Sequence, residues 1–527
     1  MKTRSLLLSH SLVAIVAVLI TTAIWLTTYF VAVNPNINNG GNVVNNNFSN
    51  NYCPNTDNTC QLPPMPKCAE TCEFVICESI PVGLTFNSSY PIFNSTTNCW
   101  LRLMSKLINI PTVFQISCFP EEAKEEILIG SYYWSLLVRD TGDGYDTDPT
   151  NTSGDGELIY NTLLSTAVDR NISVRIAQTY ENGGYWETEN LVQKSNGRIR
   201  VQYVKRSVIC WFRYPGGILH TKSWSVDGKH FYIGSANFDW RSLTNVKELG
   251  VAAFNCPCLA NDLKNLLEIY WTMGAPGAQI PKQWDNSLST PANHQTPMSV
   301  YQPTGSQAMY ISASPPGFQS CGREDDLAAM IKTIDEAQEY LYMAVMDYAP
   351  STMYLKNENK WKPELDNAIR RAAFERAVHV RLMISLWPHT YASAYGTLYS
   401  LQDISDHLPC YKWDSKDTIS DNCIKKGSIE IQLIEVPAMQ YGKIPYARVY
   451  HNKYFVTESA AYIGTSNWCS DYWQYTAGIG IIIRADDSTA KSQLVQQFTS
   501  IHERDWFSPY TIPLKNFTIS GNRTATF

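Results

Sequence analysis

Hydrophobic and polar residues along the chain form two similar series of predicted strands and amphipathic helices. The apolar run ILIGSYYW at Ile127 resembles LYMAVMDY at Leu341, and both have the character of buried strands. A second pair, NISVRIAQTY and AVHVRLMISLW, follows in the same order. Apolar residues recur at three- and four-residue spacing in segments 325–340 and 365–377, which predicts helices. Alternating strands and helices predict an α/β fold in two halves.

The chain begins with a long uncharged segment. Residues 6–33 contain no charged side chain, and about 20 apolar residues suffice to cross a bilayer as a helix. This length favours a transmembrane anchor over a cleaved signal peptide, whose apolar core is about 7–15 residues. Lys2 and Arg4 precede the span, so residues 1–5 are predicted to be a cytosolic tail and the rest lumenal or extracellular. Residues 34–66 are rich in Asn and Pro and predict a stalk.

The strongest internal repeat pairs two distant segments. HTKSWSVDGKHFYIGSAN begins at His220, HNKYFVTESAAYIGTSN begins at His451, and each predicts a strand, a turn and a second strand. The Pro-rich stretch 279–316 separates the two series, so we divide the body into repeats at 67–300 and 301–527. Packing of such repeats about a pseudo-twofold axis would bring the two histidines into one shared active site.

The residue types in these segments suit phosphodiester chemistry. In a strand, residues i and i+2 point to the same side, so His220 and Lys222 share one face, as do His451 and Lys453. One imidazole can attack phosphorus to form a phosphohistidine, while the other protonates the leaving oxygen and then activates water. The lysines stabilise charge on the non-bridging oxygens. This mechanism requires no metal ion or other cofactor, and the Cys and His residues show no zinc-ligand spacing.

Four further residues complete the two motifs. Asp227 and Glu458 are predicted to take part either directly or by orienting neighbouring backbone or lysine. Asn237 and Asn467 close the motifs, and their amides can donate hydrogen bonds to an anionic oxygen.

One more carboxylate suggests different roles for the two histidines. Glu248 lies 28 residues after His220 and is expected to hold that imidazole in its reactive tautomer, whereas Thr476 takes the corresponding place after His451. Because a paired carboxylate raises imidazole basicity, this asymmetry favours His220 as the nucleophile and His451 as the general acid, with the reverse assignment open.

Charge, cysteines and glycosylation sequons bear on substrate and compartment. A net charge of −6 argues against tight clamping of long duplexes, although protonation of all nine histidines would bring it to +3. Fourteen cysteines form an even set, which is expected in an oxidising compartment. Candidate glycosylation sites are Asn47, Asn87, Asn94, Asn151, Asn171, Asn516 and Asn522.

Both motif segments, HFYIGSANFDWRSLTNVKELG and HNKYFVTESAAYIGTSNW, resemble those of the phospholipase D superfamily. The segments IPYARVYHNK, RRAAFERAVHVRLMIS, FNCPCLANDL and CEFVICESIPVGL are similar to its animal lysosomal branch, the third and fourth phospholipase D members, over roughly residues 68–510. The resemblance implies a type II membrane protein delivered from the endoplasmic reticulum to lysosomes, often with proteolytic release of the lumenal domain. It also implies a homodimer.

For function, the resemblance implies 5′-to-3′ exonuclease activity on single-stranded DNA and RNA, with release of nucleoside 3′-phosphates. The branch is also linked to lysosomal phospholipid synthesis and to restraint of nucleic-acid sensing in innate immunity. It further implies disulfides that join Cys68 and Cys72 to the pair Cys256 and Cys258. Cys410 and Cys423 are a separate candidate for a local disulfide.

Two other functions use the same residues. A phospholipid hydrolase or transphosphatidylase of the lysosome or endoplasmic reticulum lumen would need the same His and Lys pairs, because the motifs recognise a phosphodiester and not its substituents. A catalytically inactive membrane scaffold would be indicated by loss of a motif His or Lys, and all four are present.

Overall fold

The computed structural model describes residues 60–68, 72–104, 123–138, 150–180, 186–205, 217–302, 305–354, 359–411, 423, 425–486 and 492–524. All described residues belong to one compact unit, Tyr52–Phe527. The predicted tail, the predicted anchor and most of the predicted stalk lie outside the described residues. Among the helices that the structure describes, none is long and apolar enough to cross a membrane.

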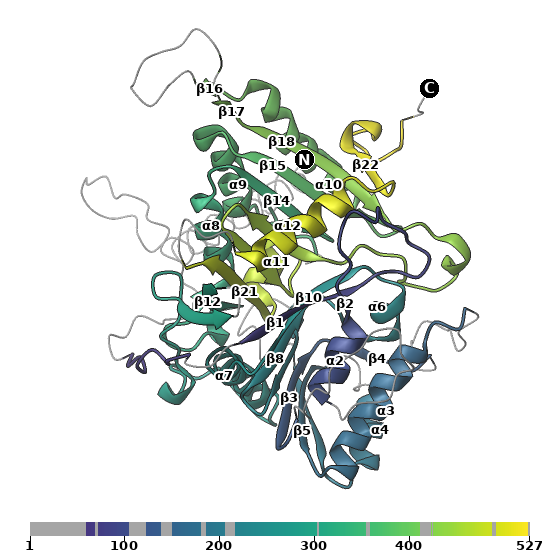
Figure 1. Ribbon diagram of the computed structural model, residues 1–527, viewed down its shortest axis with the longest axis vertical. Helices are drawn as coiled ribbons and strands as arrows, with labels where there is room; N and C mark the ends of the chain where they lie inside the picture. The colour runs from purple at the N-terminus through teal and green to yellow at the C-terminus, as the bar shows by residue number, and fades with distance from the viewer. Residues whose placement is uncertain are drawn as a thin grey trace, which may run out of the picture. The chain divides into compact units, whose positions relative to one another are not determined.

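The first half of the described chain is built on an eight-stranded sheet (Figure 1). In sheet order, the strands are β2 (Asn94–Ser95), β1 (Glu73–Ser79), β10 (Glu248–Phe254), β8 (His230–Gly234), β7 (Lys222–Val226), β3 (Glu126–Ser131), β5 (Ser173–Thr179) and β6 (Ile199–Val204). Its helices are α2 (Thr96–Met104), α3 (Gly154–Asp169), α4 (Trp186–Lys194), α6 (Trp240–Thr244) and α7 (Pro257–Met273), and the short strands β4 (Trp134–Ser135) and β9 (Phe238–Asp239) pair with each other.

The second half is built on a ten-stranded sheet. Its path runs through β11 (Met298–Gln302), β12 (Gly305–Ser314), β21 (Gly478–Ala485), β20 (Ala460–Gly464), β19 (Lys453–Thr457), β14 (Tyr340–Val345), β15 (His379–Leu386), β18 (Ser428–Glu435) and β22 (Thr511–Pro513), with β13 (Glu324–Asp325) beside β12. The helices are α8 (Asp326–Glu336), α9 (Glu364–Arg376), α10 (Ala392–Asp403), α11 (Ser470–Tyr475) and α12 (Gln493–Trp506). The predicted repeat boundary between residues 300 and 301 falls inside β11.

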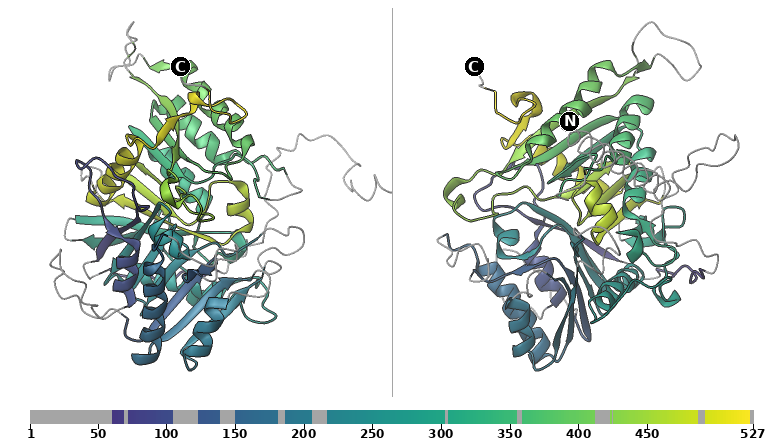
Figure 2. Two further views of the ribbon diagram at one scale, coloured as in Figure 1. Left: turned by 90° about the vertical axis from the view of Figure 1, so that its right-hand side faces the viewer. Right: turned by 180° about the vertical axis from the view of Figure 1, so that it is seen from behind.

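The two sheets repeat one topology. The order β2-β1-β10-β8-β7-β3-β5-β6 corresponds strand for strand to β13-β12-β21-β20-β19-β14-β15-β18, with the same parallel and antiparallel pairings. The predicted hairpins after His220 and His451 are therefore β7–β8 and β19–β20. Figure 2 shows from two other directions that the elements of each half stay together.

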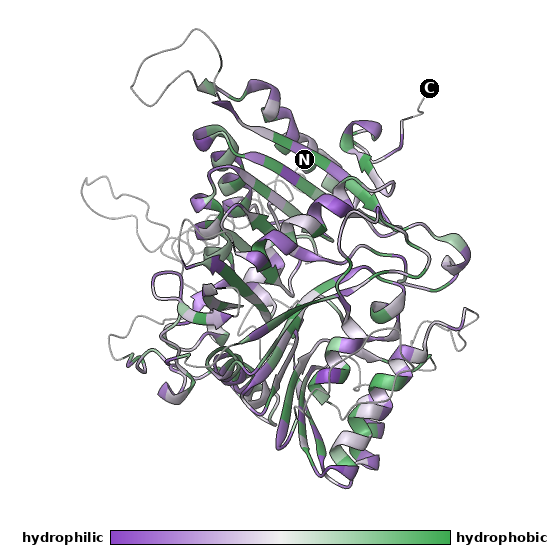
Figure 3. Ribbon diagram, in the orientation of Figure 1, coloured by the Kyte–Doolittle hydropathy of each residue, from purple (hydrophilic) through white to green (hydrophobic). Residues whose placement is uncertain are grey.

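Both faces of the central strands are covered, which explains their continuous apolar runs. In β3, Ile127 and Ile129 pack into the core beneath α2 and α3, while Leu128 faces the opposite core beneath α7. That second core continues into the other half, since it also contains Tyr310 of β12 and Ile479 of β21. Figure 3 shows the strands as mostly hydrophobic and α3 as mixed around its surface.

Disulfides tie the start of the body to both halves. The pairs are Cys68–Cys258, Cys72–Cys256, Cys77–Cys99, Cys60–Cys321 and Cys410–Cys423. The bond between Cys60 and Cys321 attaches part of the predicted stalk to the second half, and neither it nor Cys77–Cys99 was expected from the sequence. The sulfurs of Cys72, Cys256 and Cys258 lie together, but all three are oxidised and so offer no thiolate to a metal ion.

Most sequon asparagines in the described residues are exposed. Asn87, Asn94, Asn151, Asn171 and Asn522 are exposed, Asn516 is half-buried, and Asn47 lies outside the described residues. Five of these side chains are therefore accessible for glycan attachment.

Candidate active site

Two backbone bridges between the halves bring the predicted catalytic histidines to one interface. Leu219 pairs with Ala477, and Lys247 pairs with Tyr450, in the same parallel sense. The amide of His220 donates to the carbonyl of Ala477 at 2.9 Å, and that of His451 donates to the carbonyl of Lys247 at 2.8 Å. Each histidine is thus held by the backbone of the opposite half.

The two lysines lie beside their histidines. Lys222 Nζ is 3.0 Å from His220 Nδ1 and 3.1 Å from Nε2, and it donates to the His220 carbonyl at 2.8 Å. Lys453 Nζ donates to the His451 carbonyl at 2.8 Å. The histidines are only 5% and 8% exposed and the lysines are fully buried, so two His–Lys pairs line one nearly closed site.

Glu248 contacts His451 and not His220, so the sequence-based pairing is wrong. Glu248 Oε2 lies 2.8 Å from His451 Nδ1 and accepts a hydrogen bond from Ser235 Oγ at 2.6 Å. The partner of His220 Nδ1 is the carbonyl oxygen of Thr465, at 3.0 Å. The physical reason is the crossed bridge, because Lys247 pairs with the second half and carries Glu248 toward the histidine of that half.

The position that corresponds to Glu248 is Gly478 and not Thr476. Gly250 pairs with Gly234 in the first hairpin, and Gly480 pairs with Gly464 in the second, which fixes the register. A Cβ atom at Gly478 would lie 2.0 Å from Ser466 Oγ, so no side chain fits there. The asymmetry of the two imidazole partners is therefore built into the packing.

The motif acids lie in the hairpin turns, away from the histidines. Lys222 and Asp227 are separated by five residues of strand, or about 16 Å at ~3.3 Å per residue. Asp227 accepts hydrogen bonds from the amides of Lys124, Glu125 and Glu126 at 2.6 to 2.9 Å, and Glu458 from those of Gln338, Glu339 and Tyr340 at 2.8 to 3.4 Å. Of the two predicted roles, the geometry favours backbone orientation. These acids fix each hairpin to the start of β3 or β14.

The two motif asparagines have different neighbours. Asn467 Nδ2 donates to Asp347 Oδ2 at 3.1 Å and to the Tyr354 hydroxyl at 3.0 Å, while Asn237 Nδ2 donates to the Tyr133 hydroxyl at 3.4 Å. Within the described residues, the Oδ1 atom of each asparagine is buried and has no hydrogen-bond partner. Their amides are therefore held by side chains that the motifs do not contain.

Sequence analysis missed Tyr133 and Asp347. Ser131 pairs with Lys222 and Val345 pairs with Lys453, so Tyr133 and Asp347, each two residues further on, occupy corresponding positions. The aligned strands ILIGSYYW and LYMAVMDY contained this signal, since a carboxylate at the end of an apolar strand is unusual. Burial raises the pKa of Asp347, against the opposing hydrogen bond from Tyr354 and the charge of Lys453.

Burial and crowded positive charge give the histidines different proton affinities. Burial, then the charges of Lys222, Lys453 and His451, hold the pKa of His220 well below its ordinary value. Burial also lowers the pKa of His451, but the adjacent Glu248 carboxylate opposes it. Burial lowers the pKa of Lys453 to about 7, with Glu248 and Asp347 opposing.

Two other histidines limit the charge gained in acid. Burial lowers the pKa of His230 to about 4 and that of His502 to about 3. His230 and His502 therefore remain largely neutral near pH 5, so the charge of +3 expected from full histidine protonation is an overestimate.

Buried ion pairs surround the backbone bridge between Lys247 and Tyr450. Lys247 Nζ lies 3.2 Å from Glu78 Oε2 and 3.9 Å from Asp505 Oδ2, and Arg504 binds both acids at 2.8 to 3.0 Å. Tyr450, the residue before His451, donates to Asp505 at 2.9 Å. This network connects β1 and α12 to the two residues that precede Glu248 and His451.

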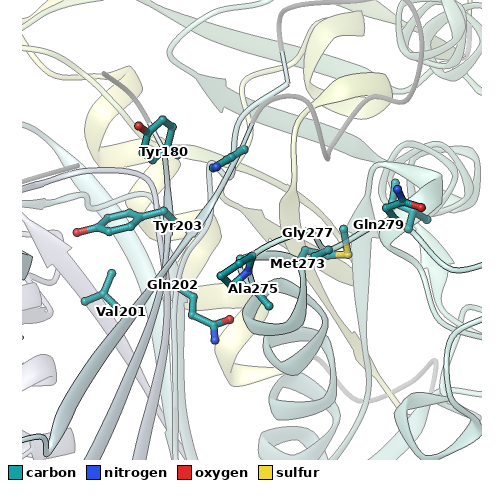
Figure 4. A pocket seen from close by; sticks show the side chains of 13 residues that line it. Tyr180, Val201, Gln202, Tyr203, Met273, Ala275, Gly277 and Gln279 are labelled. Carbon is teal, nitrogen blue, oxygen red and sulfur yellow. The ribbon is translucent and has the colours of Figure 1, made fainter. Parts of the chain in front are cut away.

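A pocket of about 580 Å³ lies at the ends of β5 and β6 (Figure 4). Tyr180 and Tyr203 line one side and residues 273–280 the other. Thr179, the residue before Tyr180, donates its hydroxyl to the Leu219 carbonyl at 2.8 Å. None of the predicted catalytic residues lines it.

Comparisons with known proteins agree with this geometry. Residues 146–412 match the family described as "PLD3/4, PLD-like domain". The chain is 38% identical over 448 residues to the 5′-3′ exonuclease PLD3 of Xenopus laevis, which covers 85% of this chain and 82% of the relative. It is 36% identical over 450 residues to PLD3 of Homo sapiens (85% and 82%), and 35% identical over 448 residues to the 5′-3′ exonuclease PLD4 of Mus musculus (84% and 80%).

Among solved structures, the phosphatidylserine synthase of Haemophilus influenzae overlaps 75% of this chain and 83% of its own, with a TM-score of 0.45 and 13% identity. The family match covers just over half of the chain, and the relatives extend that similarity to most of its length. The chain therefore belongs to the PLD3/4 family of the phospholipase D superfamily.

Proposed function

We propose that this protein is a 5′-3′ exonuclease that hydrolyses single-stranded DNA and RNA through a phosphohistidine intermediate. The observation that carries the proposal is the pair of buried His-Lys sites from two halves that meet at one interface. Fixed ammonium groups and two imidazoles supply a nucleophile, a proton donor and anion stabilisation for a phosphodiester. Relatives named as 5′-3′ exonucleases favour nucleic acid over phospholipid as the substrate.

His220 is the nucleophile in this mechanism. The Thr465 carbonyl accepts from Nδ1, so the proton stays on Nδ1 and Nε2 carries the lone pair. In this structure that lone pair faces Lys222 Nζ at 3.1 Å, and it attacks phosphorus once the bound phosphate has drawn the ammonium group to its own oxygens. The depressed pKa favours the neutral, and hence nucleophilic, form of this imidazole. Sequence analysis favoured the same residue for another reason, a carboxylate that in fact contacts His451.

His451 is the general acid. The Glu248 carboxylate stabilises its protonated form, and Nε2 then donates that proton to the departing 5′ oxygen as the Nε2–phosphorus bond forms on His220. In the second step, His451 takes a proton from water, the hydroxide attacks phosphorus, and His220 leaves. The products are a nucleoside 3′-phosphate and a strand shortened by one nucleotide.

Lys222 and Lys453 bind the non-bridging oxygens. Without substrate, burial and mutual repulsion hold the pKa of Lys222 well below its ordinary value. A phosphodiester anion between the lysines relieves that repulsion and favours both ammonium groups. Binding energy is thus directed at the reacting phosphate.

The test uses a 5′-hydroxyl single-stranded oligonucleotide at about pH 5 in excess chelator. Nucleoside 3′-phosphates should appear in order from the 5′ end, and His220→Asn and His451→Asn should each lose roughly 10²-fold or more of the rate.

A thymidine 3′-(p-nitrophenyl phosphate) separates the roles of the two histidines, because nitrophenolate leaves without a proton. On it, His451→Asn should give a burst and a trapped phosphohistidine, and His220→Asn should give neither. An intact oligonucleotide from pH 4 to 8, with turnover of phosphatidyl substrates, would replace the nuclease assignment with the lipid one.

We also propose a type II topology, with residues 6–33 as the anchor, delivery from the endoplasmic reticulum to lysosomes, and a homodimeric lumenal domain. The uncharged span and the exposed sequons support this proposal. Resistance to carbonate extraction, glycosidase-sensitive mobility and sedimentation at twice the monomer mass are expected. Full release by carbonate, with an N-terminus just after the span, contradicts the anchor.

A further inference from the structure

A series of aromatic rings runs from His220 to the protein surface. The His220 ring lies 5.0 Å from that of Tyr472, Tyr472 lies 5.6 Å from Tyr354, and Tyr354 lies 6.0 Å from Tyr391, all edge to face. Tyr472 is buried, whereas Tyr354 and Tyr391 are 39% and 43% exposed. The series therefore changes from core to surface within three ring contacts of the proposed nucleophile.

A second group of rings lies on the same loop as Tyr391. His389 stacks on Tyr446 at 5.3 Å and 15°, and Trp387 packs against His389 at 4.7 Å. Tyr446 is 54% exposed and has a φ of 54°, a left-handed conformation that is uncommon outside glycine and asparagine. Its conformation is held from the first half, where Arg241 donates to the carbonyl of Pro445 at 2.9 Å.

The loops that carry these rings lie at the edge of the ten-stranded sheet where Lys453 begins β19. Tyr354 follows β14, residues 387–391 follow β15, and Tyr446 precedes β19, which begins at Lys453. Because β14 and β15 are parallel and β19 is antiparallel to β14, their adjoining ends meet at one edge. We call Tyr354, Trp387, His389, Tyr391 and Tyr446 the aromatic rim.

The charges around the rim fit a base better than another phosphate. Beyond burial, the carboxylates of Asp347 and Asp471 raise the pKa of Tyr391, so negative charge lies close to its hydroxyl. That charge disfavours a second phosphate at the ring. A neutral planar base stacks on tyrosine through its π face, whereas a fatty acyl chain would meet polar hydroxyl groups.

We propose that the aromatic rim is a nucleobase subsite, in which a base of the bound single strand stacks on the face of Tyr391 with its edge toward Tyr354, while the scissile phosphate lies between His220 and His451. This inference rests on the proposed nuclease function. A base can reach the rim only if it has left its neighbours, which a flexible single strand permits and an intact duplex resists. The subsite therefore gives a structural basis for acting on single strands.

The test combines Tyr391→Ala with oligonucleotides that carry one abasic nucleotide at position 1, 2 or 3 from the 5′ end. On the intact strand, Tyr391→Ala should lower kcat/KM about 5- to 100-fold, which is the range expected for loss of one base–aromatic stack. The loss should come mainly from a higher KM. Tyr391→Phe should keep most of the wild-type kcat/KM. The matched control is Tyr301→Ala, since Tyr301 is 53% exposed on the edge strand β11, four strands from β19.

The abasic series decides the outcome. If the rim binds a base, the effect of Tyr391→Ala disappears on one of the abasic strands, because that strand has nothing to stack. An equal loss on all three, or no loss on the intact strand, overturns the subsite. Methyl p-nitrophenyl phosphate, which has no base, should be turned over equally by Tyr391→Ala and wild type, which shows that the variant is folded. If wild type cleaves this ester but no oligonucleotide, the proposed nuclease function fails instead.

Discussion

Replacing Glu248 by glutamine should change the pH dependence of catalysis in a direction that identifies its partner. The substitution keeps the shape of the side chain and an oxygen for His451 Nδ1, but it removes the negative charge. Glu248 Oε2 lies 2.8 Å from that nitrogen, so the centres of a carboxylate and an imidazolium are about 4 Å apart, and such a pair is worth about 4 kcal/mol at an effective dielectric constant of ~20. At about 1.4 kcal/mol per pKa unit, the pKa of His451 should fall by roughly 1 to 3 units.

The direction of the pH shift depends on which histidine must be protonated for catalysis. The general acid must be protonated, and Glu248 raises the pKa of His451 and Lys453, so losing its charge should move the basic limb of kcat/KM to lower pH. The acid limb, set by His220, should move little, because the charges that lower the pKa of His220 are those of Lys222, Lys453 and His451. Activity lost at pH 7 should therefore partly return on acidification.

The assay is kcat/KM from pH 4 to 8 for wild type, Glu248→Gln and Ser235→Ala. Ser235→Ala removes one hydrogen bond to Glu248 but keeps its charge, so we expect a shift below about one unit. A Glu248→Gln profile with a displaced acid limb and an unchanged basic limb would refute the reasoning, because it would assign the carboxylate to the nucleophile, as sequence analysis first suggested.

Three variants test what holds the site together. Arg504→Met leaves Glu78 buried beside too little positive charge and should lower the free energy of unfolding by about 3–5 kcal/mol in urea titrations. Joint replacement of Cys72 and Cys256 by alanine should cost about 2–5 kcal/mol by the same measurement, since that bond closes a loop of sequence separation 184. Asp227→Ala should cost about 1–3 kcal/mol of stability and leave the pH profile of the remaining activity unchanged; a shifted profile would show contact with the chemistry.

Sequence alone predicted the elements that depend on local patterns. The buried strands and the two hairpins follow from periodicity, and the structure has them, although β7 and β19 begin at Lys222 and Lys453 and the histidines precede them. Lys222 nevertheless lies beside His220. The partner of Glu248 could not be predicted in this way, because Lys247 crosses to the opposite half, and no periodicity records a contact across 203 residues.

Other features depended on three-dimensional register. Gly478 was missed as the counterpart of Glu248 because glycine has no side chain that would mark it as the equivalent of a carboxylate, and only the paired glycines of the strands set the register. The aromatic rim was missed because its rings come from three loops that share an edge only after the sheet has formed.

The crossed bridges also constrain how an active molecule can arise during translation. When the first half leaves the ribosome, His220 lacks the carbonyls of Ala477 and Thr465, which hold its backbone and its ring. Glu248 likewise has no imidazole to contact until His451 has emerged. Arg504, whose charge balances Glu78 beneath the bridge, is synthesised later still. A nascent chain that lacks the second half therefore has no assembled site, and activity can begin only after that half has been synthesised.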